Sequence, residues 1–121
     1  MRHRNKKRIL SRPADQRKAL MRSLVTALFE HGSIKTTEAK AKALISSAEK
    51  LITKVKGKLN KEEQMNAIRD SKQVIFTETA SRNLLEYAGQ TAKTSGFTRL
   101  TRIKYRAGDN ALLVQVDLIT E

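Results

Sequence analysis

Basic side chains gather in three parts of this sequence, and the chemistry open to them is the binding of phosphates. Segment 2–12 carries six lysines and arginines and no acidic residue, 99–106 carries four more, and in 35–40 threonine hydroxyls accompany two lysines. These side chains neutralise phosphates and release counterions, so affinity for a polyanion rises with the number of contacts. The candidate phosphate-binding residues are Arg2, His3, Arg4, Lys6, Lys7, Arg8 and Arg12 in an N-terminal arm, then Arg17, Lys18 and Arg22, then Lys35, Thr36 and Lys40, and finally Arg99, Arg102, Lys104 and Arg106.

Each basic cluster also has a simpler interpretation, namely a solvated surface without a defined ligand. Strand periodicity places Arg102, Lys104 and Arg106 on one side of a strand, with Arg99 nearby. Like charges in such an arrangement repel one another unless an anion lies across them, which favours a ligand here. For 35–40 both interpretations remain open, although a helix N-terminus would favour an anion there.

Catalytic chemistry has little support in the sequence. His3 and His31 lie in different contexts, and neither has a partner at the spacing of metal ligands. The sequence has no glycine-rich phosphate loop and no nucleophile elbow. Asp109 and Asn110 form the one polar cluster of interest, and turn chemistry accounts for it. We therefore expect no catalytic residue, metal, cofactor or small-molecule substrate.

The net charge of +13 favours a polyanionic partner. With 25 lysines and arginines against 12 acids, the compact state repels itself unless its surroundings supply counter-charge. Residues 1–22 hold nine basic side chains and one acid, or +8, while 23–121 hold sixteen and eleven, or +5. Nucleic acid is therefore the first candidate partner, and the N-terminal part dominates the field.

The apolar pattern argues against a membrane or an exported protein. No stretch reaches the length of a membrane span, and the basic start is not followed by the apolar core of a signal peptide. The absence of cysteine fits a reducing compartment. We expect a soluble, cytoplasmic protein.

The five aromatic residues indicate what kind of nucleic acid to expect. Periodicity assigns most of them to the core, which leaves few surfaces on which unpaired bases could stack. This argues against a protein that reads the sequence of single strands. It favours one that recognises the shape and backbone of folded RNA, or that binds DNA without sequence preference.

Apolar residues at helical spacing predict four helices. Pro13 suits the first position of the first helix, and Gly32 suits its left-handed C-terminal cap. Thr37, Asn60 and Thr77 are the expected N-caps of the other three. Segment 74–76 could be extended or helical. The expected helices cover 13–31, 39–55, 61–70 and about 78–89.

Alternating residues predict strands at 33–37, 97–106 and 111–119, the last two forming a hairpin around 107–110. On the second strand, Ile103 and Tyr105 are expected to face the core, opposite the basic side chains. The first strand could join an edge of the hairpin. The expected fold is α+β, with residues 1–12 as a basic arm and 13–121 as a single domain of helices packed on a small sheet.

Several strings in this order resemble bacterial large-subunit ribosomal protein seventeen across essentially the whole chain. They are MRHR, Leu10-x-Arg12 with Arg17, ALMRSLVTALFEHGSIKTT, AKAKAL, GFTR and RAGDNA. Ser95-Gly96-Phe97 stands where family members often carry Gly-Gly-Tyr. Residues that match the family motifs are Arg2, His3, Arg4, Leu10, Arg12, Arg17, Lys35, Thr36, Thr37, Lys40, Thr98, Arg99, Arg106, Gly108, Asp109 and Asn110.

The resemblance implies an α/β domain with a small mixed sheet and a basic N-terminal extension, and adds Asn110 to the candidate RNA-binding residues. It also implies a structural, non-catalytic role in the ribosome, on large-subunit ribosomal RNA near the exit of the peptide tunnel and beside neighbouring ribosomal proteins. The arm is expected to be disordered alone and ordered on RNA.

Two other classes of protein are the alternatives. A free-standing nucleic-acid-binding regulator or nucleoid protein would be expected to be a dimer with a recognition helix. An RNA-processing enzyme would need a cluster of acids or a metal site, which the sequence does not contain.

Overall fold

The computed structural model describes residues 3, 8–57 and 60–120. Within them, one strand separates the first helix from three consecutive helices, and a hairpin follows, which confirms the α+β prediction. The candidate residues Arg2, Arg4, Lys6 and Lys7 lie outside this part of the chain. The elements in order are α1 (Ala14–His31), β1 (Ser33–Thr37), α2 (Glu38–Val55), α3 (Lys61–Lys72), α4 (Glu78–Gln90), β2 (Thr98–Tyr105) and β3 (Leu112–Leu118).

The three strands form one sheet in the order β1-β3-β2. As expected, β2 and β3 are antiparallel neighbours and β1 joins the edge of the hairpin, alongside β3. Both pairs are antiparallel, so the mixed sheet that the resemblance implied is wrong. The reason is topological: β1 and β2 run in the same direction, but β3 lies between them, so each pair of neighbouring strands is antiparallel.

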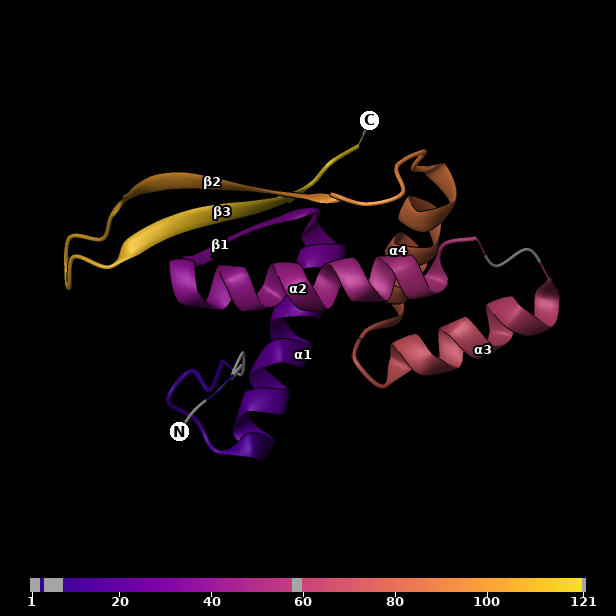
Figure 1. Cartoon of the computed structure of the whole chain (residues 1–121), viewed down its shortest axis with the longest axis horizontal. Helices are drawn as coiled ribbons and strands as arrows, with labels where there is room; N and C mark the ends of the chain where they lie inside the picture. The colour runs from indigo at the N-terminus through magenta and orange to yellow at the C-terminus, as the bar shows by residue number, and fades with distance from the viewer. Residues whose placement is uncertain (1–2, 4–7, 58–59, 121) are drawn as a thin grey trace.

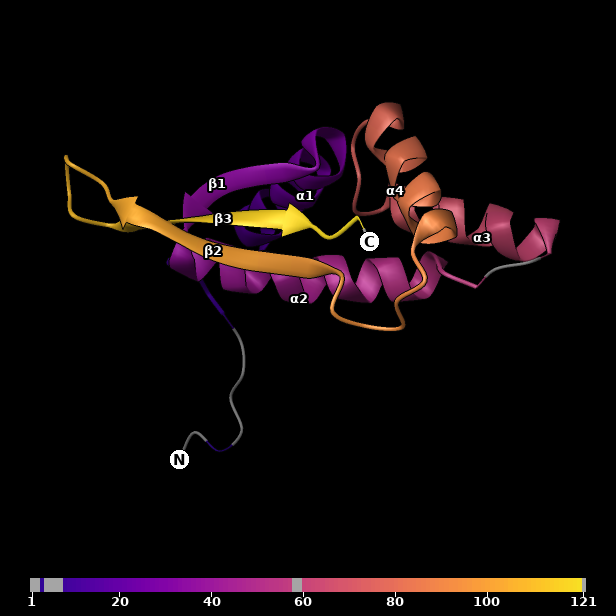
Figure 2. The same cartoon turned by 90° about the horizontal axis from the view of Figure 1, so that it is seen from above.

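Helix α2 lies along one face of the sheet, and α1 crosses α2 steeply with its C-terminal end close to the start of β1 (Figures 1 and 2). Helices α3 and α4 gather at the end of α2 away from the hairpin loop (Figure 1). The apolar stripe of α2 is buried as its periodicity predicts. The largest fully buried side chains are Phe29, Phe97, Leu28, Leu44, Ile52, Leu84, Val25, Val114 and Val116.

The helices begin and end close to the positions that the sequence predicts, but only some of the expected capping residues make a capping hydrogen bond. Gly32 is left-handed (φ 80°), and its N–H donates to the Leu28 carbonyl at 2.8 Å. Pro13 is the N-cap of α1, one residue before the expected position. The Thr77 hydroxyl accepts from the Ala80 N–H at 3.3 Å. Thr37 and Asn60 hold the N-cap positions without a side-chain hydrogen bond.

The segment 74–76, which the sequence left open, is a non-helical link between α3 and α4. Ile75 is buried, and the Phe76 N–H donates to the buried Thr26 hydroxyl oxygen of α1 at 3.1 Å. Nearby, Asn83 of α4 donates to the Phe29 carbonyl at 2.9 Å. These contacts fix the link against α1 and leave the Phe76 side chain at the surface, 54% exposed.

The distal part of the hairpin differs from the prediction. Ile103 and Tyr105 were expected in the core, but they are 42% and 64% exposed. Two causes act together. A register shift between Arg102 and Lys104 interrupts the alternation. The hairpin also projects past the end of α2, where none of the described helices lies beneath it (Figures 1 and 2).

One carboxylate joins the helix layer to the sheet. Glu49 of α2 accepts from both the N–H and the hydroxyl of Thr98, at 3.0 and 2.9 Å, where β2 begins. We expect Glu49→Ala to destabilise the protein by about 1–3 kcal/mol, since it leaves a partly buried N–H without an acceptor. Chemical denaturation would measure this. Glu49→Gln keeps one accepting oxygen and should lose less; equal losses in both variants would contradict this role.

Candidate nucleic-acid interface

The face of the sheet opposite α2 is polar and basic, and no described element covers it (Figure 1). Residues paired across antiparallel strands share a face. The register therefore sets Lys35 beside Gln115, and Arg99 beside Asp117. We call this surface the open face. It consists of Ser33, Lys35 and Thr37 on β1, Leu113, Gln115 and Asp117 on β3, and Arg99, Thr101 and Lys104 on β2.

Three exposed cations, Lys35, Arg99 and Lys104, come together on the open face from two strands that are distant in sequence. Within the described residues none of them makes an ion pair. The nearby carboxylate of Asp117 accepts from the Gln115 amide at 2.7 Å. The open face therefore offers cations whose charge a bound anion can neutralise.

Arg102 was predicted on the same strand side as Lys104, and this is wrong. Arg102 is paired with Val114, which is fully buried on the α2 side of the sheet, whereas Lys104 is paired with Leu113 after the register shift. Consistent with this, the Arg102 guanidinium lies 3.6 Å from the Glu38 carboxylate at the start of α2. The bulge reverses the alternation, so an unbroken period of two gave the wrong face.

The other candidates from 35–40 are also separated. Thr36 is paired with Val114 and so faces α2, whereas Lys40 lies in the first turn of α2. The Glu38 carboxylate in that turn also pairs with Lys42 at 3.0 Å, and this contact lowers the pKa of Glu38. Of the candidates Lys35, Thr36 and Lys40, only Lys35 contributes to the open face.

At the hairpin loop, Arg106 is held by an acid. Its Nε donates to Asp109 Oδ1 at 2.8 Å, and its Nη2 donates to Oδ2 at 2.6 Å. The Ala111 N–H also donates to Oδ1 at 3.3 Å. Asn110 takes a positive φ of 57°, as the turn composition predicts. Arg106 is thus less free to neutralise a phosphate than the open-face cations are.

The same contacts predict a pH dependence at the hairpin loop. The Arg106 guanidinium and the Ala111 N–H lower the pKa of Asp109 to about 2. A carboxyl group with a lowered pKa stabilises the fold above its unfolded pKa of ~3.9 and loses that contribution as the pH falls towards 2. Carbon-13 NMR should show Asp109 titrating near 2, and Arg106→Gln should move the midpoint upward. A wild-type midpoint near the unfolded value would refute this pairing.

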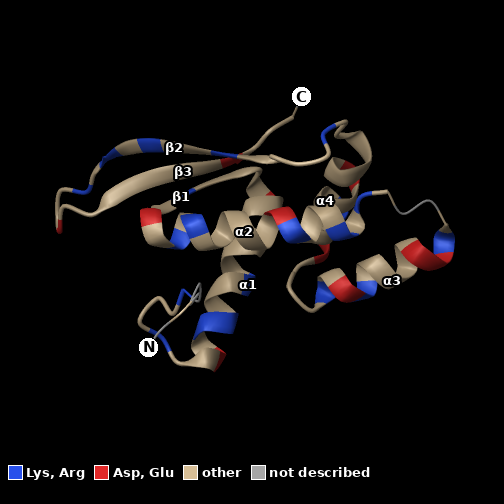
Figure 3. Cartoon of the chain, viewed as in Figure 1, with Lys and Arg blue, Asp and Glu red and all other residues tan. Residues whose placement is uncertain are grey.

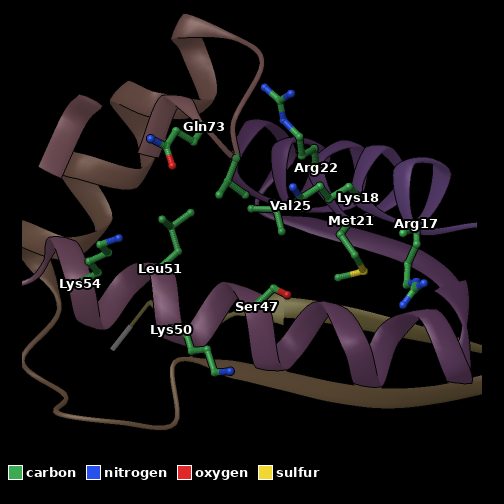
Figure 4. A pocket seen from close by; sticks show the side chains of 12 residues that line it. Arg17, Lys18, Met21, Arg22, Val25, Ser47, Lys50, Leu51, Lys54 and Gln73 are labelled. Atoms are coloured by element: carbon green, nitrogen blue, oxygen red, sulfur yellow. The ribbon is translucent and has the colours of Figure 1, made fainter. Parts of the chain in front are cut away.

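A groove lies between α1 and α2, and we call it the α1–α2 groove (Figure 4). It has a volume of about 800 Å³. Apolar side chains, including Met21, Val25 and Leu51, lie between the two helices. Around them are five cations: Arg17, Lys18 and Arg22 from α1, which were predicted, and Lys50 and Lys54 from α2, which were not.

The part of the arm that the structure describes adds exposed basic groups before α1. His3 and Arg8 are exposed, and Arg12 is partly buried. The Arg12 N–H donates to the Ile9 carbonyl at 3.3 Å, and its guanidinium donates to the Leu10 carbonyl at 2.8 Å. These bonds form a local turn that leads into α1. Figure 3 shows how basic residues are spread over α1, α2 and β2.

Sequence inspection missed Lys50, Lys54 and Phe76 as candidates. The spacing in 39–55 was used only to predict a helix, and the aromatic residues were mostly assigned to the core. No local signal identified them, because the groove depends on which face α1 presents to α2. Within residues 3, 8–57 and 60–120, no group of three acidic or histidine side chains could hold a metal, and no helix is long and apolar enough to cross a membrane.

Two comparisons with known proteins agree on one family. The family model for ribosomal protein L17 matches residues 20–119. The large ribosomal subunit protein bL17 of Desulforapulum autotrophicum is 39% identical over 125 residues, which cover 100% of this chain and 98% of that protein.

Proposed function

Because this chain belongs to the ribosomal protein L17 family, and so is a large-subunit ribosomal protein, we propose that it binds folded ribosomal RNA through three basic surfaces. These are the arm, the α1 residues Arg17, Lys18 and Arg22, and the open face. The family consists of structural ribosomal proteins and not of enzymes, so the proposed role is to hold RNA in place. Arg102, Arg106, Thr36, Lys40 and Asn110 stay candidate contacts of secondary weight.

The observation that carries this proposal is the open face. Its cations lie on a rigid sheet, and none is paired within the described residues. Cations at fixed spacing bind phosphates without reading the bases, which suits a partner recognised by its backbone and shape. The same proposal includes three further points: the division of the chain into an arm and a domain, a position near the tunnel exit, and a cytoplasmic location.

Sedimentation of a tagged copy through sucrose gradients tests this function. We expect the chain to migrate with large subunits and whole ribosomes and to stay there after a high-salt wash, because many phosphate contacts act together. Confinement to light fractions or to chromatin would contradict it and would support a free-standing nucleic-acid-binding protein instead.

Deletion of the arm should separate binding from stability. The hydrogen bonds of the described arm residues, such as Arg12 to Leu10, stay within the arm. We therefore expect removal of residues 2–12 to reduce incorporation into subunits severely, while the stability of the isolated protein changes within about 0.5 kcal/mol. Pulse-labelled incorporation and thermal melting would measure the two effects. A large fall in melting temperature would mean that the arm packs on the domain.

A further inference from the structure

The α1–α2 groove concentrates positive charge over an apolar floor. Its cations come from both helices, and no acidic residue is among the described residues that line it. One lysine, Lys54, meets the Asp70 carboxylate at 3.6 Å, and the two side chains are 59% and 45% exposed. An exposed pair at this distance offsets little of the charge. The volume of about 800 Å³ lies within the range of pockets that hold small ligands.

Two of these cations carry a donor that lacks an acceptor. The Nε atoms of Arg17 and Arg22 are buried and have no hydrogen-bond partner among the described residues. A buried donor left unpaired costs free energy, so the arrangement gains when an acceptor reaches the guanidinium group. Two oxygens of a phosphate can accept parallel hydrogen bonds from one planar guanidinium group.

The guanidinium group of one of these arginines lies over the face of an exposed aromatic ring. The guanidinium carbon of Arg22 lies 4.1 Å from the centre of the Phe76 ring, and Phe76 is 54% exposed. The buried Ile75 and the hydrogen bond from the Phe76 N–H to Thr26 hold this position from the backbone side. The ring is therefore held at the surface without contributing to the core.

We infer that the α1–α2 groove binds an RNA segment with an unpaired nucleotide, whose base stacks on Phe76 beside Arg22 while adjacent phosphates contact the groove cations. This inference rests on the proposed function and specifies one of its contacts. An acidic peptide would satisfy the lysines and arginines but has no planar group for the aromatic ring. A nucleobase stacks on both an aromatic face and a guanidinium plane, so the pair favours RNA.

The test measures whether binding depends on a base as well as on charge. The full chain is titrated with a fluorescein-labelled pentaadenylate RNA and with an abasic oligomer carrying the same phosphates. Stacking of one base on an aromatic side chain predicts roughly 5- to 150-fold tighter binding of the RNA. Phe76→Leu should abolish this preference, so that the RNA binds no more tightly than the abasic oligomer does. Thermal melting would verify that the variant folds.

Tyr105→Leu is the matched control, because Tyr105 is the other strongly exposed aromatic of the described chain and lies on the hairpin. It should keep the preference for bases. Replacing Lys50 and Lys54 together by glutamine should lower the affinity for both oligomers by the same factor. A preference that survives Phe76→Leu, or one that disappears with Tyr105→Leu, would overturn the inference. The inference would also be overturned if hexaglutamate displaced the RNA as effectively as the abasic oligomer does.

The proposed function and the groove inference can fail separately. A wild-type chain that does not sediment with large subunits would contradict the proposed function. If the wild type enters subunits, the Phe76→Leu chain should enter them too, held by the arm and the open face. Chemical probing should then show a few unpaired nucleotides gaining reactivity in the variant subunits. Unchanged reactivity there would contradict the groove inference alone.

Discussion

Replacing Lys35, Arg99 and Lys104 together by glutamine is expected to weaken binding to purified large-subunit ribosomal RNA by about 100-fold at ~0.15 M salt. Each phosphate contact that is lost removes the free energy of releasing roughly one counterion. The slope of log affinity against log salt should therefore fall by about 2 to 3. Filter binding at several salt concentrations would measure both quantities.

The choice of these three residues follows from the register. Arg102 and Arg106 are nearer in sequence to Lys104, but they pair with Glu38 and Asp109. A control with the same loss of charge replaces Lys61, Arg69 and Lys72 on α3 by glutamine. Helix α3 lies at the opposite end of the molecule from the hairpin (Figure 1). If both triple variants lost affinity equally, net charge and not the open face would be responsible.

Phe97→Ala is expected to lower the free energy of unfolding by about 3–5 kcal/mol, and the melting temperature by roughly 10–20 °C. The Phe97 ring is fully buried and meets Tyr87 edge-on, with ring centres 6.4 Å apart and planes at 80°. Its carbonyl accepts from the Ile119 N–H at 2.8 Å and from the Tyr87 hydroxyl at 3.0 Å. Truncation thus opens a cavity where α4, β2 and the end of β3 meet.

Calorimetry or urea titration would measure this loss. The matched control is Tyr105→Ala, an aromatic truncation at the loop end of β2 in the same hairpin. It should change stability by no more than about 0.5 kcal/mol because that ring is exposed. Similar losses of stability in the two variants would mean that the distal hairpin is buried in solution. The ring of Phe97 would then contribute no more to stability than that of Tyr105.

The sequence by itself determined most of the local structure. The spacing from Leu44 to Val55 suffices to give an amphipathic helix, because a period of 3.6 aligns those side chains wherever the helix packs. Gly32 and Asn110 take the positive φ values that their positions suggested. The turn residues 107–110 joined two alternating stretches into an antiparallel hairpin. The excess of basic charge, and with it the class of partner, also follows from composition.

Only the tertiary structure decided which basic residues lie on the same face. Arg102 follows the regular alternation to the α2 face, and the bulge after it places Lys104 on the open face. One extra residue in a strand leaves little trace in the sequence. Lys35 joined Arg99 because β1 paired with β3, a contact between distant segments. The groove likewise needed α1 to cross α2, and Phe76 stayed outside because Ile75 took the buried position. Local periodicity predicts what each element can bury, whereas the packing of distant segments decides what each residue meets.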